Sequence, residues 1–121
     1  MKRILVVDDE AAITRLIKLN LEAAGGYLVF TENRADRVLD AARSFQPDLA
    51  LLDIMMPGAL GTDIAAQLQD DPRLRHIKII FLTAIVRKGE TDPGHSIGGQ
   101  VIIAKPATVK ELIEAIEQVL K

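Results

Sequence analysis

Short apolar runs alternate along the chain with segments in which apolar residues recur at helical spacing. The run Ile4–Val7 stops at an acidic pair, and apolar residues then recur every three or four positions until Gly25 and Gly26. This pattern is typical of a buried strand followed by a helix that ends at glycine. Continued along the chain, it predicts five strands, over residues 4–7, 27–31, 49–53, 77–82 and 101–104.

Helices are predicted in the intervals and after the last strand. The apolar positions that mark them are Ile13, Leu16, Ile17, Leu21 and Ala24, then Ala35, Val38, Leu39 and Ala42, then Ile64, Ala65 and Leu68, and finally Val109, Leu112, Ile113, Ile116 and Leu120. Thr62 can cap the third of these helices through its hydroxyl. Thr108 and Glu111 form a capping box that opens the last one.

The interval before the last strand is different. Residues 87–100 hold four glycines, Pro93 and a single large apolar residue, Ile97. Glycine and proline disfavour helices, and a helix without an apolar face has nothing to bury. We therefore expect the fourth helix of the alternating pattern to be short, frayed, disordered or absent.

The predicted strands indicate the fold class. They lack an alternating polar face, which is typical of strands covered by helices on both sides in a parallel sheet. Five such strands separated by helices predict a doubly wound parallel sheet of the α/β class. At 121 residues we expect one domain spanning residues 1–121. Ligands in this architecture bind outside the carboxyl ends of the strands.

Composition narrows the function. The 15 basic and 17 acidic residues give a net charge of −2, with few aromatic residues, so we expect no direct nucleic-acid binding. The absence of cysteine excludes disulfides and thiolate chemistry and fits a reducing compartment. The apolar run after Met1 is too short for a signal peptide, and no stretch reaches the roughly 20 apolar residues of a membrane span. We expect a cytoplasmic protein with no membrane association.

Polar residues close four of the five predicted strands. Asp8 and Asp9 follow the first strand, Asp53 ends the third, Thr83 follows the fourth and Lys105 follows the fifth. Because right-handed crossovers bring the carboxyl ends of parallel strands to one edge of a sheet, these residues are expected to meet there. Each is common on its own. Together they predict a site with three carboxylates, a hydroxyl and an ammonium group.

That set of groups favours metal and phosphoryl chemistry. Neighbouring carboxylates repel one another, and a hard divalent cation relieves the repulsion. Mg²⁺ takes oxygen ligands and is usually held by one or two carboxylates together with a phosphate. A carboxylate can also attack phosphorus, and a metal, a cation and a hydroxyl can then stabilise the transferring phosphoryl group.

At these residues the sequence resembles a receiver domain of two-component response regulators, over essentially the whole chain. The matching segments are Ile4–Glu10, Asp53–Gly58 followed by Gly61, Leu82–Ala84, and Lys105–Pro106. The spacing agrees with the family as well: Asp53 follows Asp9 by 44 residues, Thr83 follows Asp53 by 30, and Lys105 follows Thr83 by 22. The resemblance implies a flavodoxin-like or CheY-like (βα)5 fold with strand order 2-1-3-4-5.

The resemblance also implies a Mg²⁺ site. Asp9 would bind the ion directly, Asp8 mainly through a metal-bound water, and Asp53 through its carboxylate. The backbone carbonyl of Met55, two residues after Asp53, would complete the ligands that the protein supplies.

The phosphoryl group is implied to bind beside that ion. Asp53 would be the phosphoacceptor and would receive the group from the phosphohistidine of a sensor histidine kinase or phosphotransfer protein. Lys105, Thr83 and Ala84 would hold the phosphoryl oxygens. In the family the Lys-Pro bond is cis, which X-Pro bonds tolerate.

The expected function is a switch in protein–protein contacts rather than turnover of a metabolite. The downstream protein is unknown, and the resemblance leaves a phosphorylation-dependent homodimer open. The alternative is a receiver-like module that signals without phosphorylation. A phosphatase of the haloacid-dehalogenase type is disfavoured because such enzymes carry an Asp where this chain has Met55.

Three features depart from the family pattern. Ile102 stands where receivers usually carry Tyr or Phe, so it is either packed core or a sign of lost switching. The glycine-rich residues 87–100 stand where the family has its fourth helix. We predict that they become ordered on phosphorylation or partner binding. Met55 and Ile85 flank the path of the attacking water but are apolar and cannot orient it. We therefore predict slow self-catalysed loss of the phosphoryl group.

Overall fold

The computed structural model of the chain describes residues 1–84, 96–97 and 100–121. Five parallel strands form the centre of its sheet in the order β2-β1-β3-β6-β8. The bounds are Lys2–Val7 for β1, Tyr27–Glu32 for β2, Leu49–Asp53 for β3, Lys78–Thr83 for β6 and Gln100–Ala104 for β8. In chain order this is 2-1-3-4-5, which confirms the predicted fold class and topology.

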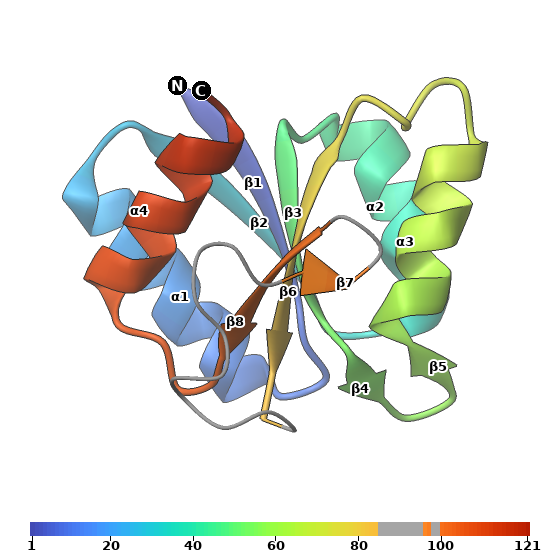
Figure 1. Cartoon of the computed structure of the whole chain (residues 1–121), viewed down its shortest axis with the longest axis horizontal. Coiled ribbons are helices and arrows are strands. Elements are labelled where there is room, and N and C mark those ends of the chain that lie inside the picture. Colours follow the sequence, from blue (N-terminus) through green and yellow to red (C-terminus); the bar gives the residue numbers. More distant parts are fainter. Residues whose placement is uncertain (85–95, 98–99) are drawn as a thin grey trace.

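Helices cover both faces of the sheet (Figure 1). Their bounds are Ala11–Ala24 for α1, Val38–Phe45 for α2, Gly61–Asp70 for α3 and Val109–Val119 for α4, with a 3-10 turn, η1, at Ala35–Arg37. The helices α1 and α4 lie on one face, and α2 and α3 on the other. Two separate apolar clusters fill the two layers, because buried strand residues point alternately to either side.

The structure confirms one of the two predicted helix caps and contradicts the other. The capping box at Thr108 and Glu111 is confirmed, with both of its hydrogen bonds present. Thr62 is not the cap of α3: the helix begins one residue earlier, at Gly61, with Leu60 in the cap position and no side-chain cap bond. Leu16 recurs at helical spacing, yet it is 59% exposed because it lies on the solvent side of α1.

The interval of residues 87–100 is described only in part. Ser96–Ile97 forms a short strand, β7, which pairs antiparallel with Gln100 and Val101 of β8 at the edge of the sheet. The sequence pattern does not predict this added strand. The expectations for a fourth helix and for its ordering on phosphorylation otherwise lie outside the described residues.

A tight hairpin links β3 to α3. Its strands are β4 at Met55–Met56 and β5 at Ala59–Leu60. The backbone N–H of Gly61 donates to the carbonyl of Ile54 at 2.7 Å. A Cβ atom on Gly61 would lie 2.3 Å from the carbonyl oxygen of Asp53. Only glycine therefore fits where α3 begins against the end of β3.

The outer edge of β2 is covered at its middle by two side chains of α1. Lys18 Nζ donates to the carbonyl of Val29 at 2.6 Å, and the N–H of Val29 donates to Glu22 Oε2 at 3.0 Å. Lys18 and Glu22 also pair with each other at 3.2 Å. The hydrogen bond from Val29 lowers the pKa of Glu22, with the neighbouring Lys18 adding to the effect. Both backbone groups of this edge residue are thereby satisfied.

No helix in the described part of the chain has the length and apolar character needed to span a membrane.

Candidate functional site

The polar residues that close the strands meet at the carboxyl edge of the sheet, the lower edge in Figure 1. Lys105 Nζ lies 2.5 Å from Asp8 Oδ2 and 3.2 Å from Asp53 Oδ1. Residues separated by almost the whole chain thus share one site. This juxtaposition is the one that the order of polar strand ends predicts.

Three carboxylates form the centre of the site. Oxygen atoms of Asp8, Asp9 and Asp53 all lie within 4.8 Å of one another. Asp8 and Asp53 are buried, whereas Asp9 is exposed. Oxygen ligands around Mg²⁺ at about 2.1 Å would be separated by about 3 to 4 Å. The donor set and its size therefore fit a magnesium ion.

Lys105 is the cation that faces this cluster. Its peptide bond to Pro106 is cis, and its backbone N–H donates to the carbonyl of Thr83 at 2.9 Å, next to the end of β6. Burial disfavours the ammonium form, but hydrogen bonds and charge attraction from Asp8 and Asp53 outweigh it and raise the pKa of Lys105. Lys105 therefore stays protonated between the two buried carboxylates.

The surroundings of Asp53 disfavour its ionisation. Burial raises its pKa, and the negative charge of Asp8 adds to the rise. Lys105 and a hydrogen bond from the backbone N–H of Met55 act in the opposite direction and offset only part of it. A cation bound at the cluster would favour the charged form and so remove part of this cost.

Asp8 is held at several points. Its Oδ1 accepts from the backbone N–H of Glu10 at 2.9 Å, in addition to the ion pair with Lys105. Its backbone carbonyl accepts from Nδ2 of Asn33 at 2.8 Å. Sequence reasoning missed Asn33, because a polar residue in the loop after a strand gives no signal of its own.

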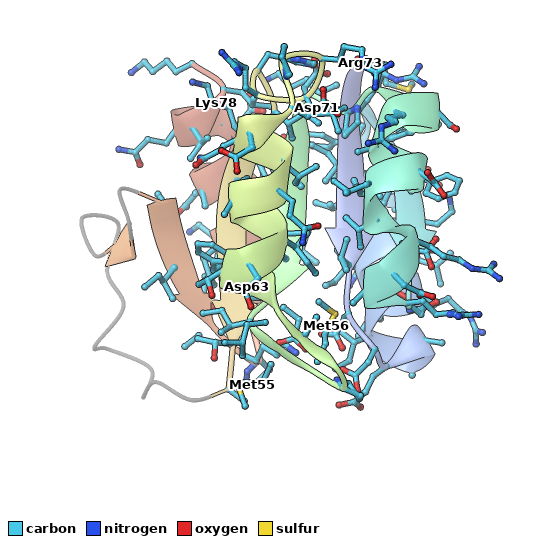
Figure 2. All side chains as sticks on the ribbon, turned by 90° about the vertical axis from the view of Figure 1, so that its right-hand side faces the viewer. Met55, Met56, Asp63, Asp71, Arg73 and Lys78 are labelled. Atoms are coloured by element: carbon cyan, nitrogen blue, oxygen red, sulfur yellow. The ribbon has the colours of Figure 1, made fainter. Side chains whose placement is uncertain are left out.

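The remaining predicted residues lie around this centre. Thr83 is buried at the end of β6, and Ala84 follows it on the exposed side. Met55 is 56% exposed at the same end of the molecule (Figure 2). Ile85 lies outside the described residues. Ile102 is only 2% exposed and packs in the apolar cluster on the α2–α3 face, which agrees with its interpretation as packed core.

A cleft of about 510 Å³ opens beside the carboxylates. Asp9 and Asn33 lie on one wall, and the β4–β5 hairpin and the first turn of α3, with Asp63, form the other. Figure 2 shows Met56 and Asp63 at this end of the molecule, and Asp71, Arg73 and Lys78 at the opposite end. The cleft gives solvent and small ligands access to the flank of the site.

Comparisons with known proteins agree with this geometry. The polar-differentiation response regulator DivK of Brucella anthropi is 35% identical over 119 residues, which cover 98% of this chain and 96% of DivK. The structure of the response regulator TrrA from Thermotoga maritima in complex with Mg²⁺ and BeF superposes with a TM-score of 0.80 at 34% identity, covering 98% of this chain and 99% of that chain.

A second solved structure that matches is a chain in the complex of the histidine kinase ThkA with the response regulator TrrA. It has a TM-score of 0.81 and 33% identity, with full coverage of both chains. The chain therefore shares the doubly wound α/β fold of these response regulators. The model of the response regulator receiver domain matches residues 4–117. The chain belongs to this family, which acts in two-component signalling.

Proposed function

We propose that residues 1–121 form one receiver domain that accepts a phosphoryl group on Asp53 in a Mg²⁺-dependent reaction. The observation that carries the proposal is the position of Asp53: its carboxylate lies with those of Asp8 and Asp9 and 3.2 Å from the Lys105 ammonium. Two buried like charges facing one cation are costly for folding alone. They are useful where a metal and a phosphoryl group complete the site.

The proposed step is an in-line transfer. A carboxylate oxygen of Asp53 attacks phosphorus, the bond from phosphorus to the donor nitrogen breaks, and an acyl phosphate forms as the imidazole leaves. Asp8, Asp9, Asp53 and the carbonyl of Met55 are the proposed ligands of Mg²⁺, which would supply charge stabilisation for the phosphoryl oxygens. Burial limits the access of water to Asp53.

Lys105, Thr83 and Ala84 are proposed to receive the transferred group. Lys105 already contacts Asp53 and would donate to a phosphoryl oxygen once the new charge forms. The hydroxyl of Thr83 and the backbone N–H of Ala84 are the proposed neutral donors. Because the ammonium is held by Asp8 as well as by Asp53, it is placed in advance and needs little reorganisation.

The surface next to the site suits a helical donor protein. On α1 four exposed apolar residues follow a spacing of four, three and four: Ala12, Leu16, Leu19 and Ala23. Leu16 and Leu19 are 59% and 60% exposed. That spacing matches the seam by which one helix packs on another. Because α1 begins shortly after Asp9, a helix on this seam can present a histidine near the site.

The wider setting follows from the same proposal. The donor would be a sensor histidine kinase or phosphotransfer protein in the cytoplasm, and the output would be a changed contact with a downstream protein or a second phosphorylated copy.

The loss of the phosphoryl group from Asp53 by self-catalysed hydrolysis should be slow, since the exposed Met55 offers no polar group to orient water. The alternative is a receiver-like module that signals without phosphorylation, and the phosphorylation experiment below distinguishes the two.

Intact-mass measurement after incubation with acetyl phosphate and MgCl2 tests the proposal. The expected result is the gain of one phosphoryl group, which disappears in Asp53→Asn and in the presence of EDTA. Asp63→Asn is the matched control, since Asp63 is an exposed carboxylate across the adjoining cleft, and it should be phosphorylated like the wild type. Equal phosphorylation of Asp53→Asn would refute the assignment.

A further inference from the structure

The amide of Asn33 joins three segments of the chain at the acidic end of the sheet. Its Nδ2 donates to the backbone carbonyl of Asp8 at 2.8 Å and to the hydroxyl of Thr14 at 2.9 Å. The hydroxyl of Thr14 in turn donates to the carbonyl of Ala11 at 3.1 Å. The chain of bonds thus links the loop after β2, the end of β1 and the first turn of α1.

The contacted carbonyl belongs to the peptide that joins Asp8 to Asp9. A peptide is planar, so holding its oxygen fixes the orientation of the whole unit and the directions in which the two flanking side chains leave the backbone. The carboxylate of Asp8 is anchored independently by Glu10 and Lys105. Asp9 is exposed, and its placement depends on the peptide that Asn33 holds.

We propose that Asn33 is a positioning residue for the magnesium site, with Thr14 acting through it. Asn33 touches neither the ion nor the phosphoryl group in this assignment. It presets the Asp8–Asp9 peptide so that both carboxylates converge with Asp53 before any cation arrives. Groups outside the ligand shell that orient metal ligands typically change metal affinity by about 10- to 100-fold. This inference rests on the proposed function, because it presumes a magnesium site.

Burial distinguishes this role from a general contribution to folding. Thr14 is 2% exposed, so its hydroxyl makes hydrogen bonds to protein groups rather than to water. Asn33 is half-buried and lines the cleft beside the site, where water can replace its amide. Loss of Asn33 should therefore leave the fold largely intact while the peptide between the two acids becomes less well oriented.

Magnesium titration by calorimetry, with melting temperatures measured in parallel, tests the inference. Asn33→Ala should weaken Mg²⁺ binding about 10-fold while its melting temperature without Mg²⁺ stays close to that of the wild type. Thr14→Val should weaken binding in the same direction, and Thr14→Ser, which keeps the hydroxyl, should bind like the wild type. Because Thr14 acts through Asn33, the double variant Asn33→Ala/Thr14→Val should bind no more weakly than Asn33→Ala.

The outcomes separate the two proposals. If the wild type shows no Mg²⁺ binding, the proposed function fails. If the wild type binds but Asn33→Ala binds within twofold of it, the positioning role is refuted. A lower melting temperature of Asn33→Ala with unchanged Mg²⁺ affinity would assign Asn33 a structural role alone. Additive effects of the two substitutions would contradict the order in which Thr14 and Asn33 act.

Discussion

Two aspartates flank the same strand and have opposite surroundings. Asp48 precedes β3 and is exposed, and its Oδ2 accepts from the backbone N–H of Arg3 at 2.8 Å. Asp53 ends β3 and is buried beside Asp8, with one lysine between them. The carboxylate before β3 thus makes a hydrogen bond that stabilises the fold, whereas the carboxylate at the end of β3 is buried next to a second negative charge, which costs stability.

Two further carboxylates at the amino ends of the strands, Glu117 and Asp71, also have partners. Glu117 accepts from Lys2 and from the hydroxyl of Tyr27, at 2.6 and 2.7 Å. Asp71 lies between Arg43 and Arg73 at the opposite end from Met55 and Asp63 (Figure 2). Glu117 and Asp71 thus each have basic partners that balance their charge. The carboxyl-end rim instead concentrates negative charge, and this imbalance marks it as the end built for a ligand.

The largest difference between the rims should appear at two glycines. In Gly61→Ala the new methyl group would collide with the backbone of Asp53, and we expect a loss of about 3 kcal/mol in the free energy of unfolding. Gly26 has a positive φ but open space around it, so Gly26→Ala should cost roughly 1–2 kcal/mol. Urea unfolding measures both. Gly61→Ala should also weaken Mg²⁺ binding, whereas Gly26→Ala should not, and a wild-type-like Gly61→Ala would contradict the close approach.

Neutralising Asp53 should change stability, whereas neutralising Asp48 at the other end of β3 should not. Burial and Asp8 raise the pKa of Asp53, so the native state binds its proton more tightly than the unfolded chain does. Ionisation of Asp53 therefore costs stability as pH rises above 3.8 and through the raised pKa. Asp53→Asn should be more stable than the wild type at pH 7 without Mg²⁺, and this advantage should vanish in acid.

Asp48→Asn is the control for this comparison. It keeps an oxygen that can accept from Arg3, so its free energy of unfolding should change by less than about 0.5 kcal/mol. Urea unfolding across a pH series measures both variants. A lower stability of Asp53→Asn at neutral pH would show that Lys105 more than compensates the buried carboxylate.

The smallest effect concerns Tyr27, the single tyrosine of the chain. Burial raises the pKa of its phenol to about 12, and the hydrogen bond and charge of Glu117 add to the rise. Its stabilising contribution is full below pH 10 and is lost as pH climbs toward about 12. Absorbance of the tyrosinate should report this late titration. Glu117→Gln should lower the midpoint only in part, and a wild-type midpoint near 10 would contradict the buried hydrogen bond.

Much of the fold and the centre of the site follow from one-dimensional patterns. Apolar runs such as Ile4–Val7 predict strands because both faces of the sheet are covered. Asp53, Thr83 and Lys105 could be assigned together because parallel strands place their carboxyl ends at one edge.

Other features depend on contacts that sequence patterns do not contain. Asn33 meets Asp8 and Thr14 only after β1 and β2 pair side by side. The start of α3 is set by the space between Gly61 and Asp53 rather than by the capping preference of Thr62. Helical spacing places Leu16 among the apolar positions of a helix, but it does not show whether Leu16 faces the sheet or the solvent.

The side chains that cover the edge of β2 have a consequence for crowded solutions. An incoming strand needs a free donor and a free acceptor at the middle of the edge that it joins. At Val29 both are already occupied by Glu22 and Lys18, although the neighbouring Leu28 and Phe30 are exposed and apolar. At this point of the β2 edge the domain can thus carry exposed apolar side chains without offering another copy a template for strand addition.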